Sequence, residues 1–228
     1  MANLSVPEMF TFITRDFEDT WNALARDASA KGRGNFMFAL HSMILLEWAC
    51  RLCATDPTGK WIIILSSELH KIEPKYFTVL PGTCRLPNEF ALPSMSGKPE
   101  TELLSAIFDL IRNGQAHQYQ QILAQLSDGV PFILILTGAA PGRELDKVRA
   151  AGRVKDHLGV RRDGGGLGLK IRPDWLYLDI KDAITRAGLP TSGLTFKYLE
   201  RPGGSKTHYQ YDSAKLEGAL LSSGHDKV

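Results

Sequence analysis

The feature that most constrains this fold is a long segment, residues 36–53, that is apolar on almost every side of a helix. A helix of that kind must be buried, either at the centre of a protein or in a lipid bilayer. His41, Glu47 and Arg51 interrupt the apolar run, and the composition is ordinary for a globular protein, with 43% hydrophobic and 23% charged residues. We therefore expect a buried helix of a bundle and not a membrane span.

Amphipathic helices are predicted before and after this segment. Residues 9–30 place apolar side chains at every third or fourth position, which favours a helix packed by one face: Phe10, Ile13, Phe17, Trp21, Leu24 and Ala28. Residues 61–72 begin with a β-branched run that is compatible with a short buried strand or with the start of a helix, and we predict the helix.

A further helix is predicted over residues 99–113. Its apolar stripe continues through residues 119–126, which favours one long helix interrupted at Gly114.

The hydrophobic period changes after residue 128. Residues 132–137 form an apolar run that predicts a buried strand, and residues 167–171, after a glycine-rich turn, are expected to pair with it. Residues 141–158 suit a polar helix or an ordered loop, residues 174–187 suit a helix, and residues 194–199 suit a third, edge strand. We predict a mainly α fold with a helical bundle over residues 1–127. A small α+β extension with two or three short strands follows over residues 128–228, packed on the bundle and ending in a loose tail.

The net charge and the cysteine content limit which partners and which cell compartment we expect for this protein. The net charge of +2 and a pI near 8.4 mean that any contact with nucleic acid comes from a local patch, which argues against a tight duplex binder. The first residues carry no basic leader with an apolar core, and three cysteines suggest free thiols in a reducing compartment. We predict a cytoplasmic protein that does not contact a membrane.

Several local patterns are explained better by structure than by chemistry. Cys50 and Cys53 lie near a helix end, whereas a redox pair normally opens a helix, and no second ligand pair completes a zinc site. We predict buried thiols, no metal and no cofactor. Residues 163–168 are glycine-rich but lack the ending of a phosphate-binding loop, which favours a hairpin turn. The basic segment, residues 149–162, is expected to be a solvated face or, alternatively, a guide for an RNA backbone.

One short motif combines groups that can handle a phosphate and a proton. Arg112, Asn113 and His117 follow directly on the apolar stripe of residues 103–111. Asn113 and His117 share a helix face, but Arg112 and His117 lie about 140° apart around a straight helix. These two converge only if Gly114 distorts the helix or if a second copy of the helix completes the site. The alternative is a plain helix end, with Arg112 on the last carbonyl groups and His117 half exposed.

The sequence around this motif resembles the signature of the HEPN superfamily (higher eukaryotes and prokaryotes nucleotide-binding domains). Residues 110–119 read LIRNGQAHQY, and the signature is an arginine, a polar residue that is often asparagine, three variable residues and a histidine. The helix with an internal acid at residues 45–52 is similar to an earlier core helix of that family. The resemblance covers residues 9–126 and is specific only around the motif. It implies a HEPN-like helical bundle.

Carried to this sequence, the resemblance implies a role for each residue of the motif. His117 would act as general base on a ribose 2′-hydroxyl or as acid toward the leaving oxygen. Arg112 would hold the scissile phosphate, and Asn113 would orient the phosphate or the histidine. Glu47 is expected either to pair with Arg51 within its helix or to position Arg112.

The resemblance also implies an activity and partners. Many members are metal-independent endoribonucleases, toxins or RNA-processing domains, and they typically dimerise with two motifs facing each other. We therefore expect a homodimer that cleaves RNA by attack of the 2′-hydroxyl and, for a toxin, an antitoxin partner. The alternative function is a catalytically inactive HEPN-like module that binds RNA, a nucleotide or another protein.

Overall fold

A computed structural model of the chain describes residues 5–26, 35–78, 102–108, 110–111, 124–125, 131–136, 143–153, 157–163 and 166–195. They belong to one compact unit, Met1–Phe196. The helices are α1 (Val6–Arg26), α2 (Asn35–Cys53), α3 (Lys60–Ile72), η1 (Pro74–Phe77), α4 (Leu103–Phe108), α6 (Leu145–Ala150), α7 (Pro173–Arg186) and η3 (Leu189–Thr191). The strands are β1 (Ala124–Gln125), β2 (Pro131–Leu136), β3 (Leu158–Asp163) and β4 (Gly166–Ile171). The protein is therefore mainly helical with a small sheet, which confirms the predicted fold class at that level.

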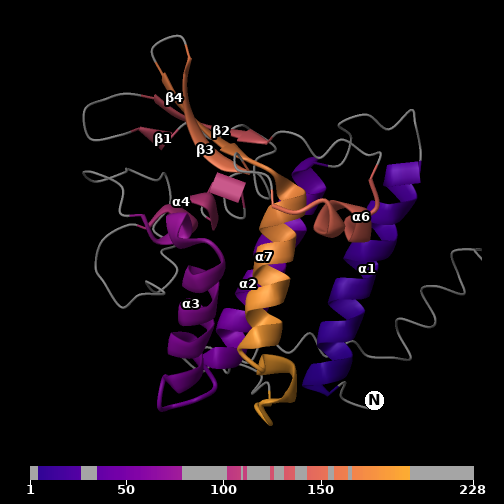
Figure 1. The fold of residues 1–228 in the computed structure, drawn as a ribbon. Coiled ribbons are helices and arrows are strands. Elements are labelled where there is room, and N and C mark those ends of the chain that lie inside the picture. Colours follow the sequence, from indigo (N-terminus) through magenta and orange to yellow (C-terminus); the bar gives the residue numbers. More distant parts are fainter. Residues whose placement is uncertain are drawn as a thin grey trace, which may run out of the picture. The chain divides into compact units, whose positions relative to one another are not determined.

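Helix α2 lies among the other long helices and is buried on most sides (Figure 1). Leu45, Leu46 and Leu52 are at most 1% exposed. In the part of the chain that the structure describes, α2 is the one helix long and apolar enough to cross a membrane by length and composition, and 61% of that apolar stretch is buried inside the protein. Burial of this kind is typical of a core helix.

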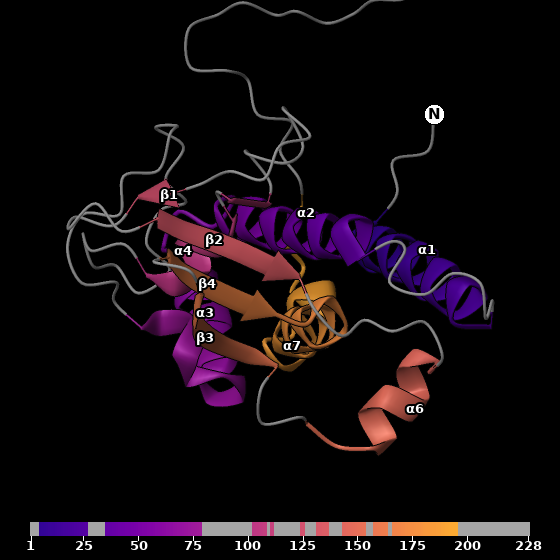
Figure 2. The same ribbon diagram turned by 90° about the horizontal axis from the view of Figure 1, so that it is seen from above.

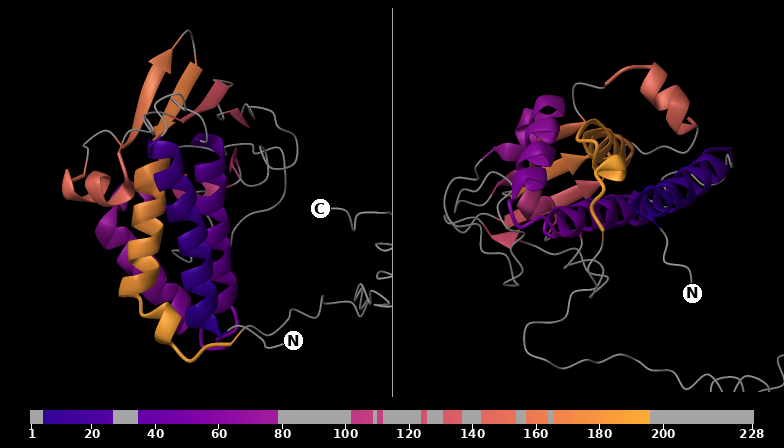
Figure 3. Two further views of the ribbon diagram at one scale, coloured as in Figure 1. Left: turned by 90° about the vertical axis from the view of Figure 1, so that its right-hand side faces the viewer. Right: turned by 90° about the horizontal axis from the view of Figure 1, so that it is seen from below.

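Helix α7 completes the helical core although it comes late in the chain. Tyr177 stacks on Phe17 of α1 with ring centroids 3.6 Å apart, and its hydroxyl donates a hydrogen bond to the carbonyl oxygen of Thr14 at 3.2 Å. Leu176 and Ile180 are at most 1% exposed, and α7 packs against both α2 and α3. Figure 3 shows α7 beside α1 and α2. The first helices and α7 therefore share one apolar core.

The sheet has the strand order β1-β2-β4-β3 and lies at one end of the helices (Figure 2). Strands β2 and β4 run parallel, with Phe132 opposite Leu167. Strands β3 and β4 pair antiparallel, and their last pair is Asp163 and Gly166, so a hairpin lies in the glycine-rich region where one was predicted, while residues 164 and 165 lie outside the described part of the chain. Leu169 in β4, the strand between β2 and β3, is fully buried.

These elements test the predicted helices and strands directly. Helix α3 confirms the helix and not the strand for residues 61–72, and β2, β4 and α7 confirm the two paired strands and the later helix. The continued helix beyond Gly114 is wrong at Ala124 and Gln125, which form β1 and pair antiparallel with β2. The physical reason is that this pairing satisfies backbone groups along an edge of β2 that a helix would leave without partners.

Two differences concern the edge strands. Strand β3 was not predicted, because its residues belong to the basic segment and carry no continuous apolar run. It forms by pairing along its whole length with β4. Of the third strand expected over residues 194–199, Leu194 and Thr195 are not in a strand, and the other residues lie outside the described part of the chain.

Candidate functional site

The predicted catalytic residues Arg112, Asn113 and His117 lie outside the described residues, so their arrangement stays a prediction. The structure does describe the segment that leads to them. The side chains of α4 are buried apart from one serine, and Leu110 and Ile111 are 1% and 0% exposed. Arg112 is therefore the residue that directly follows a buried segment of the core.

Glu47, the predicted supporting residue, pairs with Arg51 one turn later in α2. The Nε of Arg51 donates a hydrogen bond to the Oε1 of Glu47 at 2.8 Å. The Arg51 side chain is 54% exposed and that of Glu47 is 19% exposed, so this is an ion pair at the edge of the core. The alternative role of Glu47, positioning Arg112, stays a prediction.

Cys50 and Cys53 are free and buried. Burial raises the pKa of each thiol to about 12, with smaller contributions from Cys53 and Glu47 at Cys50 and from Asp56 at Cys53. A thiol that stays protonated at neutral pH is a poor nucleophile and a poor metal ligand. Among the described residues, no group of three His, Cys, Asp or Glu side chains is arranged to hold a metal ion.

Three residues of the basic segment, residues 149–162, contact acidic side chains: Arg149, Arg153 and His157. Arg149 of α6 binds Asp182 of α7, with 2.5 Å between Nη2 and Oδ1. Arg153 and His157 both contact buried carboxylates, and His157 is only 2% exposed. The prediction that this segment is a solvated face is therefore wrong at His157. These three side chains face carboxylates of their own fold, which argues against an RNA guide at these positions.

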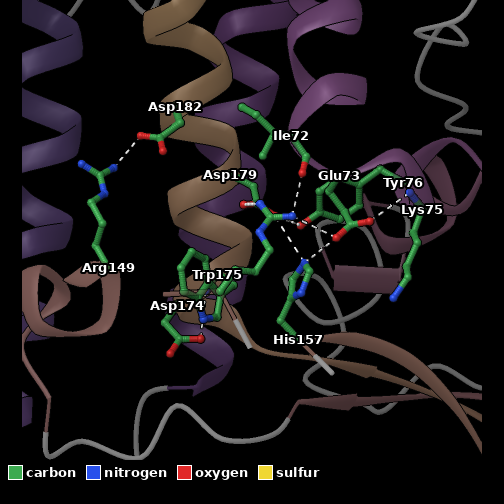
Figure 4. Close-up of polar contacts among 11 residues, drawn as sticks. Ile72, Glu73, Lys75, Tyr76, Arg149, His157, Asp174, Trp175, Asp179 and Asp182 are labelled. Atoms are coloured by element: carbon green, nitrogen blue, oxygen red, sulfur yellow. Dashed lines mark hydrogen bonds and ion pairs between the residues drawn. The ribbon is translucent and has the colours of Figure 1, made fainter. Parts of the chain in front are cut away.

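Five residues form what we call the buried charge cluster: Glu73, Tyr76, Arg153, His157 and Asp179. Figure 4 labels all of them except Arg153. The Nη1 of Arg153 donates to Glu73 Oε2 at 3.0 Å, and its Nη2 donates to Asp179 Oδ1. The Nε2 of His157 lies 3.0 Å from Glu73 Oε2 and 3.5 Å from Asp179 Oδ2. The hydroxyl of Tyr76 donates to Asp179 Oδ2 at 3.0 Å. One guanidinium and one imidazole therefore lie between two carboxylates.

The cluster joins three parts of the fold. Glu73 follows α3 and caps η1, where its Oε1 accepts a hydrogen bond from the backbone N–H of Lys75 at 3.1 Å. Tyr76 belongs to η1 and Asp179 to α7. Arg153 and His157 come from the stretch between α6 and β3. The contacts therefore connect the approach to β3 with both α3–η1 and α7.

Burial sets the chemistry of the cluster. The side chains of Glu73, His157 and Asp179 are 8%, 3% and 2% exposed, whereas that of Arg153 is 31% exposed. Burial raises the pKa of Tyr76 well above its ordinary value, and the negative charge of Asp179 adds to the effect. The hydroxyl of Tyr76 therefore stays protonated and donates a hydrogen bond to Asp179. Carboxylates this deeply buried cannot contact a large substrate in the folded state, so the arrangement suits a role within the fold.

Sequence reasoning did not find this cluster. Arg153 and Glu73 are 80 residues apart, and nothing local in the sequence pairs them. The one available signal was Asp179, which lies among Trp175, Leu178 and Ile180 on the predicted apolar side of its helix. A buried acid at such a position indicates an undetected cationic partner.

Comparisons of this chain with protein-family models, with curated proteins and with solved structures found no match.

Proposed function

We propose that this chain is a metal-independent endoribonuclease with a HEPN-like motif, and that Arg112, Asn113 and His117 act at a site shared by two copies of the chain. The observation that supports the proposal is the direct succession of the buried segment ending at Ile111 and the motif beginning at Arg112. Catalytic groups that follow a packed element are held more precisely than groups on a free loop. The resemblance of residues 110–119 to the HEPN signature supplies the reaction class.

The proposed reaction uses the nucleophile that RNA itself carries. His117 of one copy takes the proton of a ribose 2′-hydroxyl, and the 2′-oxygen attacks the adjacent phosphorus. The bond from phosphorus to the 5′-oxygen breaks, and that oxygen takes a proton from water, so the shared site needs one His117 and Arg112 of the other copy. Arg112 stabilises the charge that develops on the non-bridging oxygens. The products are a 2′,3′-cyclic phosphate and a 5′-hydroxyl, and DNA is not cut because it has no 2′-hydroxyl.

The experiment compares purified wild-type protein with His117→Ala and Arg112→Ala on mixed RNA substrates in EDTA. We expect the first variant to lose about 10²–10⁴-fold in rate and the second about 10²–10³-fold. His70→Ala is the matched control, because His70 is exposed on α3 and should leave the rate unchanged. Cleavage that persists unchanged in both motif variants would contradict the proposal.

A shared site makes a separate prediction about mixed dimers. Arg112→Ala and His117→Ala chains, inactive alone, should regain part of the activity when they are co-refolded, because the mixed dimer contains one intact copy of each residue. Absence of recovery in a dimer shown by light scattering would contradict the shared site. Wild-type protein that dimerises and binds RNA without cutting it would identify the inactive module.

A further inference from the structure

Strand β3 lies at an edge of the sheet. In the strand order β1-β2-β4-β3 it pairs with β4, and it has no second neighbour among the strands that the structure describes. The hairpin of β3 and β4 extends away from the helices (Figures 1 and 3). An edge strand carries a row of backbone N–H and C=O groups that its own sheet does not use, and such a row can pair with another chain.

The hydrogen bonds of the hairpin decide which residues of β3 use that edge. The backbone N–H of Arg172 donates to the carbonyl oxygen of His157 at 2.9 Å, so these two residues form a hydrogen-bonded pair. Bonded and non-bonded pairs alternate along an antiparallel ladder. Continued through the register of β3 and β4, this alternation identifies the residues that direct their backbone groups outward as Leu158, Val160 and Arg162.

A side chain of η1 agrees with this assignment at the first outward residue. The Nζ of Lys75 donates to the carbonyl oxygen of Leu158 at 3.3 Å. A carbonyl group on the opposite side of the strand would point at β4 instead. Among the described residues, the part of the edge that stays open is therefore formed by the backbone N–H and C=O groups of Val160 and Arg162.

The charge along this edge selects the kind of strand that fits. Positions 161 and 162 of β3 are both arginine, and Lys75 lies at the start of the edge. Successive strand positions alternate between the two faces of a sheet, so each face has one arginine position. The single acid of β3, Asp163, belongs to the pair next to the turn. Opposite charges on neighbouring strands are stabilising, so an added strand with acidic side chains fits best.

The same charges disfavour a second copy of β3. The register that uses both open residues of each copy pairs Val160 with Arg162 and sets Arg161 opposite itself, and like charges directly opposite each other are destabilising. Single-stranded RNA is also attracted by arginine, but its phosphates only accept hydrogen bonds and cannot donate to the outward carbonyl oxygens. An extended peptide supplies both donors and acceptors.

We propose that the outward edge of β3 binds an acidic segment of a partner protein as an added strand, in register with Val160 and Arg162. The partner backbone pairs with the N–H and C=O groups of these two residues, and its acidic side chains offset the charges of Arg161 and Arg162. This inference does not depend on the proposed ribonuclease activity, and either can fail alone.

The first test needs no variant. An end-blocked heptapeptide of alternating glutamate and valine is the probe, and its lysine–valine counterpart is the control. In full-length ¹⁵N-labelled protein, we expect a saturating acidic peptide to slow hydrogen exchange of the Val160 and Arg162 amides about tenfold. The amides of Gly159 and Arg161, which bond to β4, should not change. Failure of the acidic peptide to bind at about 1 mM, or equal protection by the lysine peptide, would overturn the proposal.

A pair of proline variants tests the direction of the backbone groups. Val160→Pro removes an outward N–H only, so the hairpin should form while affinity for the acidic peptide falls about tenfold. Arg161→Pro removes an N–H that bonds to β4 and should destabilise the hairpin. Undiminished binding by folded Val160→Pro would contradict the proposed edge.

The charge is tested without any change of backbone. A double variant, Arg161→Gln with Arg162→Gln, keeps both backbone N–H groups and should bind the acidic peptide about tenfold more weakly, with less dependence on salt. Unchanged affinity in this variant would overturn the proposal.

Two further measurements examine the other occupants. Self-association of wild-type protein that Val160→Pro abolishes, measured by light scattering, would identify a second copy at this edge. Octauridylate RNA that protects the Val160 and Arg162 amides more than the acidic peptide does would identify RNA. Either result would overturn an acidic partner strand.

Discussion

Phe17 and Tyr177 stack nearly parallel, with ring centroids 3.6 Å apart and ring planes 11° apart, and so join α1 to α7. Phe17 also contacts the rings of Phe38 and His41 in α2, each at 5.1 Å between centroids. It is 2% exposed, and Tyr177 is fully buried. One aromatic residue therefore connects three helices, one of which lies far along the chain.

Truncation of Phe17 should be among the more damaging single substitutions in α1. We expect Phe17→Ala to lower the free energy of unfolding by about 3–5 kcal/mol, because it removes a buried ring and leaves a cavity beside Tyr177. Phe12→Ala on the same helix is the control: Phe12 is 63% exposed, so its loss should cost less than about 0.5 kcal/mol. Urea unfolding followed by circular dichroism measures both. Equal losses would mean that the Phe17 stack does not stabilise the core.

Removal of Arg153 should destabilise the protein through the carboxylates it leaves behind. Arg153→Met deprives Glu73 and Asp179 of their shared guanidinium, and breaking a buried pair typically costs about 3–5 kcal/mol. We expect the lower end of that range, because Arg153 keeps about a third of its side chain in water. Arg149→Met breaks the half-exposed pair with Asp182 and should cost less than about 1 kcal/mol. A smaller loss for Arg153→Met than for Arg149→Met in urea unfolding would contradict this assignment.

His41 should make the fold sensitive to acid. Burial lowers the pKa of His41 below its ordinary value of 6.5, although a hydrogen bond from Nε2 to the carbonyl oxygen of Ile13 and the charge of Asp16 oppose the shift. The unfolded chain therefore binds a proton more readily, so stability is complete above about pH 6.5 and declines as pH falls below it.

The measurement is the midpoint of urea unfolding between pH 5 and pH 7. His41→Gln keeps a donor for the Ile13 carbonyl but cannot gain a proton, so its midpoint should decline less on acidification than that of wild type. His70→Gln, a change at an exposed histidine, should decline as wild type does. A His41→Gln curve parallel to wild type would show that this histidine does not titrate between pH 5 and pH 7.

The thiols of Cys50 and Cys53 should not react with a disulfide reagent in the native state. Cys50 and Cys53 are buried, with pKa values raised to about 12, so neither supplies thiolate at pH 8. In a Cys84→Ser variant, a disulfide reagent should detect almost no thiol until urea is added and then two per chain. Fast reaction of the native variant would contradict the buried assignment.

The helices with strong periodic patterns were predictable from sequence. The apolar run of α2, the three-and-four spacing of α1 and the period of α7 each leave few alternatives, and the structure places them as helices. The strands β2 and β4 were predictable because each is a short apolar run beside glycine. Strand β3 was not, since its stability comes from pairing with β4 and not from its own residues.

The candidate site was also predictable from sequence only in part. The motif at Arg112 and His117 is a local pattern and could be proposed from residues alone, whereas its geometry needs more than one element. The pair between Glu47 and Arg51 was also foreseeable, because it lies one turn apart on a single helix. Nothing local indicated that Arg153 would bind both Glu73 and Asp179.

The sequence by itself determined which segments form the central helices and the strands β2 and β4, because hydrophobic period is a property of neighbouring residues. Only the tertiary structure decided that α7 shares a core with α1 and that His157 lies between two carboxylates. The physical reason is distance along the chain. Contacts across 80 residues or more depend on how whole elements pack, and no local pattern encodes which charges that packing will bury together.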